Sequence, residues 1–148
     1  CLVGSEMCIR DSSSKEHLQQ FAHSPSLGHI TTFGGHPVPC AASAAASALL
    51  QSTDWNRVEQ VGQTIEAAMR GCAHVREVRR IGLYIAVELD SSEAVNEVVQ
   101  TAMQRGVLVF YFLSTPQAFR IAPPLNINDV DLNEALDTLI ACIEQANA

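Results

Sequence analysis

The sequence has almost no lysine: Lys15 is the only one among its 148 residues, against eight arginines. Any chemistry that needs a lysine amine must therefore use Lys15 or a residue that this chain lacks. Lys15 lies beside Glu16 in a polar segment, whereas a catalytic lysine needs burial or a cationic neighbour to lower its pKa. The sequence thus makes Lys15 a poor candidate for a catalytic amine.

Dense basic clusters, long apolar runs and paired cysteines are also missing. The formal net charge is −7, which argues against nucleic acid or an anionic membrane as a partner. No apolar run approaches the roughly 18 residues that span a bilayer. The five cysteines are widely spaced, with no Cys-x-x-Cys pair, as is typical of reduced thiols in a cytosolic protein. We therefore expect a cytoplasmic protein.

The histidines of the first third of the chain do not form a metal-binding pattern. His23, His29, His36 and Cys40 follow one another at steps of six, seven and four residues. Structural zinc sites use compact pairs of ligands, and no such pair is present. We therefore expect no metal site.

Apolar residues at steps of three and four predict helices in a chain about one domain long. Pro37 suits the first turn of a helix, because its missing N–H needs no partner there, and that helix should run to about Gln51. The other predicted helices are 13–21, one that Thr53 caps and Gly71 ends, 92–105 stopped by Gly106, and a last one capped by Asn128 or Asp129.

Strands alternate with these helices in the second half of the chain. Apolar residues occupy every second position of 83–89, which predicts a strand with one buried face. Gly82 marks a turn or bulge before it, the apolar run 107–113 predicts a short buried strand, and 118–122 predicts another. From Val75 onward the order is ββαββα. This order predicts an α+β layer with two helices on one face of a small, mainly antiparallel sheet.

The stretch "TTFGGHP" has the ingredients of a phosphate site. Thr31 and Thr32 supply hydroxyl groups, Gly34 and Gly35 let the backbone come close, and a helix is expected to open at Pro37. Hydroxyls, backbone N–H groups and a helix N-terminus all stabilise a bound phosphate. The same residues are also common in a tight turn ahead of an Ala-rich helix, and spacing alone leaves both readings open.

Four segments in order resemble one family. The chain is similar to the class III (ornithine/acetylornithine-type) aminotransferases, which use pyridoxal 5'-phosphate (PLP) on the fold type I scaffold. The resemblance implies that the chain ends with the C-terminal small domain of that fold, preceded by the last loop of the large domain. The segments that carry it are "SSKEHLQ", "LGHITTFGGHPVPCAA", "RRIGLYIAVEL" and "FRIAPPLNI".

The resemblance implies a homodimer with its active site at the interface. In the family, the Thr before the aromatic residue of "TTFGG" binds the cofactor phosphate of the partner subunit. By position this is Thr32, with Thr31 as a second candidate. Many relatives have Asn where this chain has His36, so the role of His36 is left open.

The resemblance also implies a receptor for the substrate carboxylate. In the family, the Arg of the "RiaPPL" strand binds the α-carboxylate, and here that residue is Arg120. Alternation along the strand agrees, because Phe119 and Ile121 face one side and Arg120 the other. A guanidinium offers a planar, bidentate match to a carboxylate.

The Schiff-base lysine of the family has no counterpart in this chain. That lysine lies upstream of the matching region, and Lys15 matches an ordinary exposed lysine. We expect residues 1–12 to be a non-native segment, because "CLVGSEMCIRDS" has no period and fits no targeting signal. Residues 13–52 then form the end of the large PLP-binding domain with a connecting helix, and 53–148 form the small domain.

The predicted function is therefore that of a transaminase parent. It would move an amino group from an acetylornithine-like or other ω-amino donor to 2-oxoglutarate. Two alternatives stay open, namely a class III enzyme of another reaction type, such as an aminomutase or decarboxylase, and a non-catalytic fragment.

Two further groups have no assigned role. Arg76, Arg79 and Arg80 form either an anion site or, as we expect, a solvated strand edge. Tyr111 and Phe112 lie between the last two strands, where they line a substrate channel or fill the core.

Overall fold

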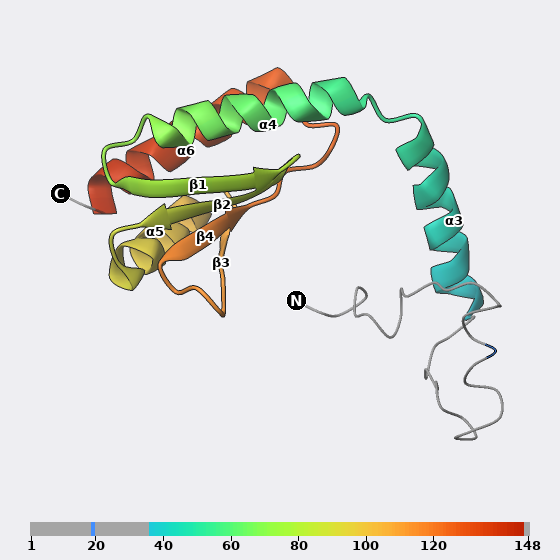
Figure 1. Cartoon of the computed structure of the whole chain (residues 1–148), viewed down its shortest axis with the longest axis horizontal. Coiled ribbons are helices and arrows are strands. Elements are labelled where there is room, and N and C mark those ends of the chain that lie inside the picture. The colour runs from blue at the N-terminus through green and yellow to red at the C-terminus, as the bar shows by residue number, and fades with distance from the viewer. Residues whose placement is uncertain (1–18, 20–35, 147–148) are drawn as a thin grey trace. The chain divides into compact units, whose positions relative to one another are not determined.

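The computed structural model describes Gln19 and residues 36–146. The chain divides into two compact units, Cys1–Ser52 and Thr53–Ala148. In the first unit, helix α3 (Pro37–Gln51) begins and ends where the sequence predicts (Figure 1). Apart from Gln19, the predicted helix 13–21 lies outside the described residues. No helix in the described part is long and apolar enough to cross a membrane.

The second unit is an antiparallel sheet with three helices. After α4 the order is ββαββα, as predicted, and the sheet order is β1-β2-β4-β3. All three strand pairs are antiparallel. The elements are α4 (Trp55–Arg70), β1 (Val75–Ile81), β2 (Tyr84–Leu89), α5 (Ser92–Gln104), β3 (Phe110–Tyr111), β4 (Ala118–Ile121) and α6 (Asp129–Ala146).

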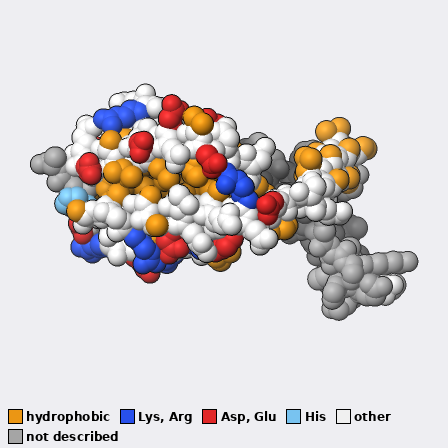
Figure 2. All heavy atoms as spheres, turned by 90° about the horizontal axis from the view of Figure 1, so that it is seen from above, with side chains coloured by type: hydrophobic (Ala, Val, Ile, Leu, Met, Phe, Trp, Pro, Cys, Tyr) orange, Lys and Arg blue, Asp and Glu red, His pale blue; other side chains and the backbone are white. Residues whose placement is uncertain are grey.

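The helices cover one face of this sheet and leave the other open. Helix α4 packs on β1 and β2, α5 packs on β2, β3 and β4, and α6 packs against α4 and α5. The side chains between these layers make one core, and those with no exposed surface include Ile85, Val87, Val95, Phe119 and Ile143. The α+β fold is therefore confirmed. Figure 2, viewed over α4 and α6, shows hydrophobic side chains in a band bordered by acidic and basic groups.

Local signals in the sequence fix the ends of most elements. Gly82 has a φ of 56° in the turn between β1 and β2, and Gly106 has a φ of 89° after α5. The N–H of Gly106 donates to Met103 and that of Val107 to Ala102, which satisfies two carbonyls at the end of α5. Asn128 caps α6, since its side chain accepts from the N–H of Asp131 at 2.9 Å.

Two predictions about local structure are wrong. The cap of α4 is Asp54 rather than Thr53, and its carboxylate accepts from two backbone N–H groups of the first turn. The apolar run 107–113 forms only the two-residue β3, whose residues are exposed, because this edge strand pairs with β4 alone. Within the run Val109 is buried, but Leu108 is 80% and Leu113 89% exposed.

Candidate functional site

The described part of the phosphate stretch is the start of α3. Thr31 and Thr32 lie outside the described residues, so their role stays a prediction. His36 is the N-cap, and its Nδ1 accepts from the N–H of Val38 at 3.3 Å. Asn is a favoured residue at this position for the same reason. The sequence offered this signal for His36, because Pro37 already marked the first helical turn.

The first turn of α3 has few N–H groups left for an anion. Pro37 and Pro39 have none, and the N–H of Val38 donates to His36. The helix therefore offers its dipole to a phosphate at this end, while hydrogen-bond donors have to come from the preceding residues.

Arg120 lies on the open face of the sheet. Its strand neighbours Phe119 and Ile121 are buried in the core, whereas Arg120 is half-buried on the other side. The register places it between Ala86 of β2 and Phe110 of β3. The alternation predicted for "AFRIA" is therefore present in the structure.

Two aromatic rings hold the guanidinium of Arg120. Its Cζ atom lies 5.9 Å from the ring centroid of Tyr84 and 6.0 Å from that of Phe110. Contacts of this kind attract a cation without neutralising its charge. Tyr84 in turn meets Phe112 edge to face, with centroids 6.3 Å apart.

Arg120 differs from the other arginines in the described part of the chain. Arg57, Arg70, Arg76, Arg79 and Arg80 each bond to a carboxylate, and Arg105 donates to the amide oxygen of Gln145. Arg120 makes neither a hydrogen bond nor an ion pair to any residue of Gln19 or 36–146. Its full positive charge is therefore available to an anion from outside this part of the chain.

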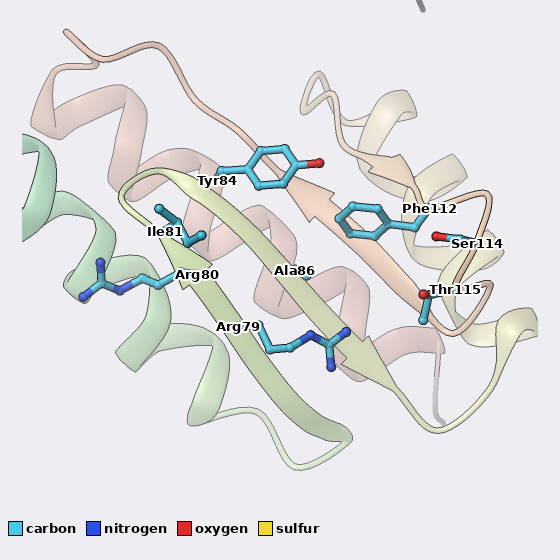
Figure 3. Close-up of a pocket in the computed structure, with 8 residues that line it drawn as sticks. All are labelled: Arg79, Arg80, Ile81, Tyr84, Ala86, Phe112, Ser114 and Thr115. Carbon is cyan, nitrogen blue, oxygen red and sulfur yellow. The ribbon is translucent and has the colours of Figure 1, made fainter.

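A pocket of about 340 Å³ opens on the same face of the sheet (Figure 3), and Arg120 is not among the residues that line it. Two of the lining residues are also neighbours of Arg120: Ala86 is its register partner, and the ring of Tyr84 lies against its guanidinium. Figure 3 shows Arg79 extended over the open face and Arg80 turned away toward α4. The pocket is lined by Arg79, Arg80, Ile81, Tyr84, Ala86, Phe112, Ser114 and Thr115.

Phe112 and Tyr111 separate in the structure. Phe112 lines the pocket, and its predicted place in a substrate channel stays a prediction. Tyr111 is 41% exposed and stacks on Phe110, with ring centroids 4.8 Å apart, so it does not fill the core. Tyr84 and Phe110, which flank Arg120, were not singled out from the sequence. Tyr84 had a signal, because the alternation of 83–89 puts it on the face opposite the core. Phe110 had none, since the run 107–113 is apolar at every position.

Acidic partners occupy all three arginines of the predicted β1 cluster. Arg79 donates to Glu77 and, at 2.8 Å, to Glu88. Arg76 donates to Asp90 at 2.6 Å and lowers the pKa of that carboxyl. The cluster is thus a set of ion pairs rather than an anion site.

Arg80 ties β1 to α4. Its Nε donates to Glu66 at 2.6 Å, and its two terminal nitrogens donate to Glu59 at 2.6 and 2.9 Å. Its side chain is only 14% exposed, so the prediction of a solvated residue is wrong for Arg80. Hydrogen bonds from Arg80, and then from Arg70, lower the pKa of Glu66. This structural role had no signal in the local sequence, since the partners are 14 and 21 residues away.

The described residues contain no group of three or more His, Cys, Asp or Glu that could hold a metal ion. His23 and His29 lie outside them. Cys72 and Cys142 are buried free thiols, and burial raises the pKa of both, whereas Cys40 is exposed.

The chain matches known aminotransferases over most of its length. The family model for class-III aminotransferases matches residues 3–143. That match includes residues 3–12, whose non-native origin stays a prediction. Acetylornithine aminotransferase from Haemophilus ducreyi is 34% identical over 117 residues, covering 79% of this chain and 29% of that enzyme. The enzyme of the same name from Corynebacterium efficiens is 33% identical over 122 residues, with 81% and 29% covered.

Solved structures agree with these matches. Ornithine aminotransferase from Toxoplasma gondii superposes with a TM-score of 0.69 at 29% identity, covering 80% of this chain and 30% of that one. A second structure of that enzyme is described as having partial occupancy of PLP at its active site. The chain therefore spans less than a third of the length of these relatives.

Proposed function

The chain belongs to the class III aminotransferases, and from that premise we propose that it is the C-terminal part of a PLP-dependent transaminase. The enzyme would transfer an amino group from an acetylornithine-like or other ω-amino donor to 2-oxoglutarate. Because the chain covers 29% of its curated relatives, the activity, the substrates and the dimer of the whole protein belong to this proposal. The observation that carries it is the half-buried guanidinium of Arg120, which has no acidic partner in the described part.

Arg120 would bind the α-carboxylate of the amino acid and of the oxo acid. The rings of Tyr84 and Phe110 fix the guanidinium on the open face, and a carboxylate that arrives there completes a bidentate pair. The pocket that its neighbours Ala86 and Tyr84 help to line would leave room for the rest of the substrate. Arg120 thus orients the substrate, which is how a binding residue raises the rate of a reaction whose chemistry belongs to a cofactor.

PLP would supply the electron sink for transamination when bound. Thr32, with Thr31, would hold its phosphate across the interface of a cytoplasmic homodimer. The dipole of α3 would stabilise a phosphate at the start of the helix. Because Pro37 and Pro39 have no N–H to donate, the threonine hydroxyls would supply more of the hydrogen bonds to that phosphate. No lysine occurs among the described residues, so covalent attachment has to use a residue outside them.

Product analysis distinguishes the proposed reaction from its same-family alternatives. An enzyme that carries this chain is supplied with PLP, N-acetylornithine or ornithine, and 2-oxoglutarate. We expect glutamate to form in step with loss of the amino donor, and only when 2-oxoglutarate is present. Consumption of the amino acid without 2-oxoglutarate would indicate an aminomutase or decarboxylase instead.

A spectrum distinguishes an enzyme from a non-catalytic fragment. The 148-residue chain is mixed with PLP, and the absorbance of a lysine-bound cofactor is recorded. We expect no such band, because Lys15 lacks the surroundings of a catalytic lysine. A band that disappears in Lys15→Ala would overturn the hypothesis of a non-catalytic fragment and place catalysis in this chain.

A further inference from the structure

We infer that Arg79 is a positioning residue that keeps Arg120 available for a substrate carboxylate, by holding the carboxylates of Glu77 and Glu88 away from it. The inference rests on the proposed role of Arg120 as a carboxylate receptor. It concerns what prevents that receptor from being neutralised by acids of its own sheet.

Arg79 and Arg120 stand on opposite sides of a small residue. Register pairs join Arg79 to Ala86 and Ala86 to Arg120, so the three lie in one row across β1, β2 and β4. Neighbouring strands are about 4.8 Å apart, which puts the two arginine backbones about 10 Å apart. In this row only the methyl group of Ala86 stands between them, and both Arg79 and Ala86 line the pocket.

Glu88 is the acid nearest to Arg120 in the register of the sheet. It pairs with Ala118, two residues before Arg120 on the same face, so Glu88 and Arg120 are diagonal neighbours. Diagonal neighbours lie about 7–8 Å apart, within reach of two long side chains. Glu88 nevertheless bonds to Arg79, at 2.8 Å, with 23% of its side chain exposed.

A second carboxylate, that of Glu77, repels the carboxylate of Glu88. It lies directly opposite Glu88 across β1 and β2, and like charges in that position repel. Arg79 donates to both carboxylates, and its positive charge offsets the repulsion between them. Without its guanidinium, two adjacent carboxylates would share the open face, with Arg120 diagonal to Glu88 on the same face. Glu88 would then turn toward Arg120 and compete with a substrate carboxylate.

The experiment uses the 148-residue chain and 2-oxoglutarate as the probe. Titration is followed by NMR through the side-chain Nε–H signal of Arg120, which the rings of Tyr84 and Phe110 shift away from those of other arginines. The signal is assigned by its loss in Arg120→Gln. Thermal unfolding of each variant shows that it is folded, and the exposed side chain of Arg79 makes Arg79→Gln a mild change.

We expect Arg79→Gln to weaken 2-oxoglutarate binding by about two- to fivefold, the range of an exposed ion pair. The Arg120 signal should also move in the ligand-free variant, because the guanidinium leaves the rings for Glu88. The double variant Arg79→Gln/Glu88→Gln should regain the original affinity and signal. Arg76→Gln is the matched control, since it removes the same charge from β1 but frees only Asp90.

The outcomes separate the inference from the proposed function. If Arg120→Gln binds 2-oxoglutarate as well as the unchanged chain, the carboxylate receptor itself is wrong. If Arg120→Gln abolishes binding while Arg79→Gln has no larger effect than Arg76→Gln, the receptor stands and the positioning role of Arg79 is overturned. Failure of the double variant to recover would also overturn it, because Arg79 would then contact the ligand directly.

Discussion

The distribution of carboxylates separates Arg120 from most of the other arginines in the described part of the chain. Arg76, Arg79 and Arg80 come from one short strand and look alike in the sequence, yet each is taken by an acid close to it in the fold. Arg120 sits one register step beyond Ala86 and is held by rings instead. Charge density in the sequence is therefore a poor guide here, whereas strand alternation located Arg120 correctly.

Substitution of Arg120 tests its role in turnover. In an enzyme that carries this chain, Arg120→Lys keeps the charge and loses the bidentate fork, so it should raise KM for 2-oxoglutarate and for the amino donor while PLP stays bound. Arg120→Ala should cost more, about 2–5 kcal/mol in kcat/KM, because the substrate carboxylate loses its partner. Steady-state kinetics and cofactor absorbance on the same preparations measure both effects.

The competing interpretation is that Arg120 only stabilises the sheet. The melting temperature decides between them, with Arg57→Lys as a control at an arginine that pairs with Asp129 of α6, away from the open face. A lowered melting temperature with unchanged KM in Arg120→Lys would remove Arg120 from the binding site.

Thr32 is the second residue whose role can be measured. Because the first turn of α3 offers few N–H donors, we expect a threonine hydroxyl to contribute a large share of phosphate binding. Thr32→Ala should weaken PLP binding by about 1–3 kcal/mol, the range for a hydrogen bond to a charged group, in the assembled enzyme. Thr31→Ala should have the smaller effect. Equal affinity of Thr32→Ala and the unchanged enzyme, measured by equilibrium dialysis, would make Thr32 a turn residue only.

At the scale of elements, the close approach of α4 to the β1–β2 turn depends on Gly62. A Cβ atom added there would lie 2.5 Å from the carbonyl oxygen of Gly82 and 3.1 Å from Nη1 of Arg80. The sequence carried a signal for this contact, since a glycine within a helix costs about 1 kcal/mol and usually has a packing reason. What the sequence could not supply was the partner, which lies 20 residues further along the chain.

Gly62→Ala should therefore destabilise the fold despite the better helix propensity of alanine. The backbone carbonyl of Gly82 has little freedom to move, so we expect a net loss of about 1–3 kcal/mol in the free energy of unfolding. Gly71→Ala is the matched control: its nearest contact is 3.3 Å and its φ of −73° suits alanine. Denaturant unfolding of both variants measures the difference. Equal stability of Gly62→Ala and Gly71→Ala would mean that α4 and the turn adjust freely.

The elements themselves followed from the sequence wherever periodicity and end signals agreed. Helices α3 and α5 were predicted to within a residue at each end, because Pro37 and Gly106 fix the backbone locally. The run 107–113 failed because hydrophobicity does not distinguish a central strand from an edge strand. Two of its apolar side chains lie on the open face instead of in the core: Phe110 lies against Arg120, and Phe112 lines the pocket.

At the scale of the whole molecule, the core belongs to one part of the chain. The buried cluster runs from Val58 to Ile143, and no side chain of α3 is buried. Within the same part, the ion pair Arg80–Glu66 links β1 to α4, and the ion pair Arg57–Asp129 links α4 to α6. The fold class could be predicted from the sequence because the helices and strands that build this core follow one another within one continuous stretch of the chain. Strand alternation also predicted that Arg120 lies on the face opposite the core. The neighbours of Arg120 on that face, Ala86 and Phe110, could not be predicted, since they depend on the register of three strands.

A chain of residues 53–148 should therefore fold without residues 1–52. We expect its melting temperature to match that of the 148-residue chain, because every residue of the described core is retained. For a domain of this size a loss of 1 kcal/mol lowers the melting temperature by about 4–8 °C, so circular dichroism detects even one missing packing contact. Phe119→Ala in the shortened chain is the control for sensitivity: it removes a fully buried ring and should cost about 3–5 kcal/mol. If the shortened chain melts at least 4 °C lower while Phe119→Ala shows its full cost, residues 1–52 contribute contacts to the second unit, and Arg120 has to be studied in the longer chain.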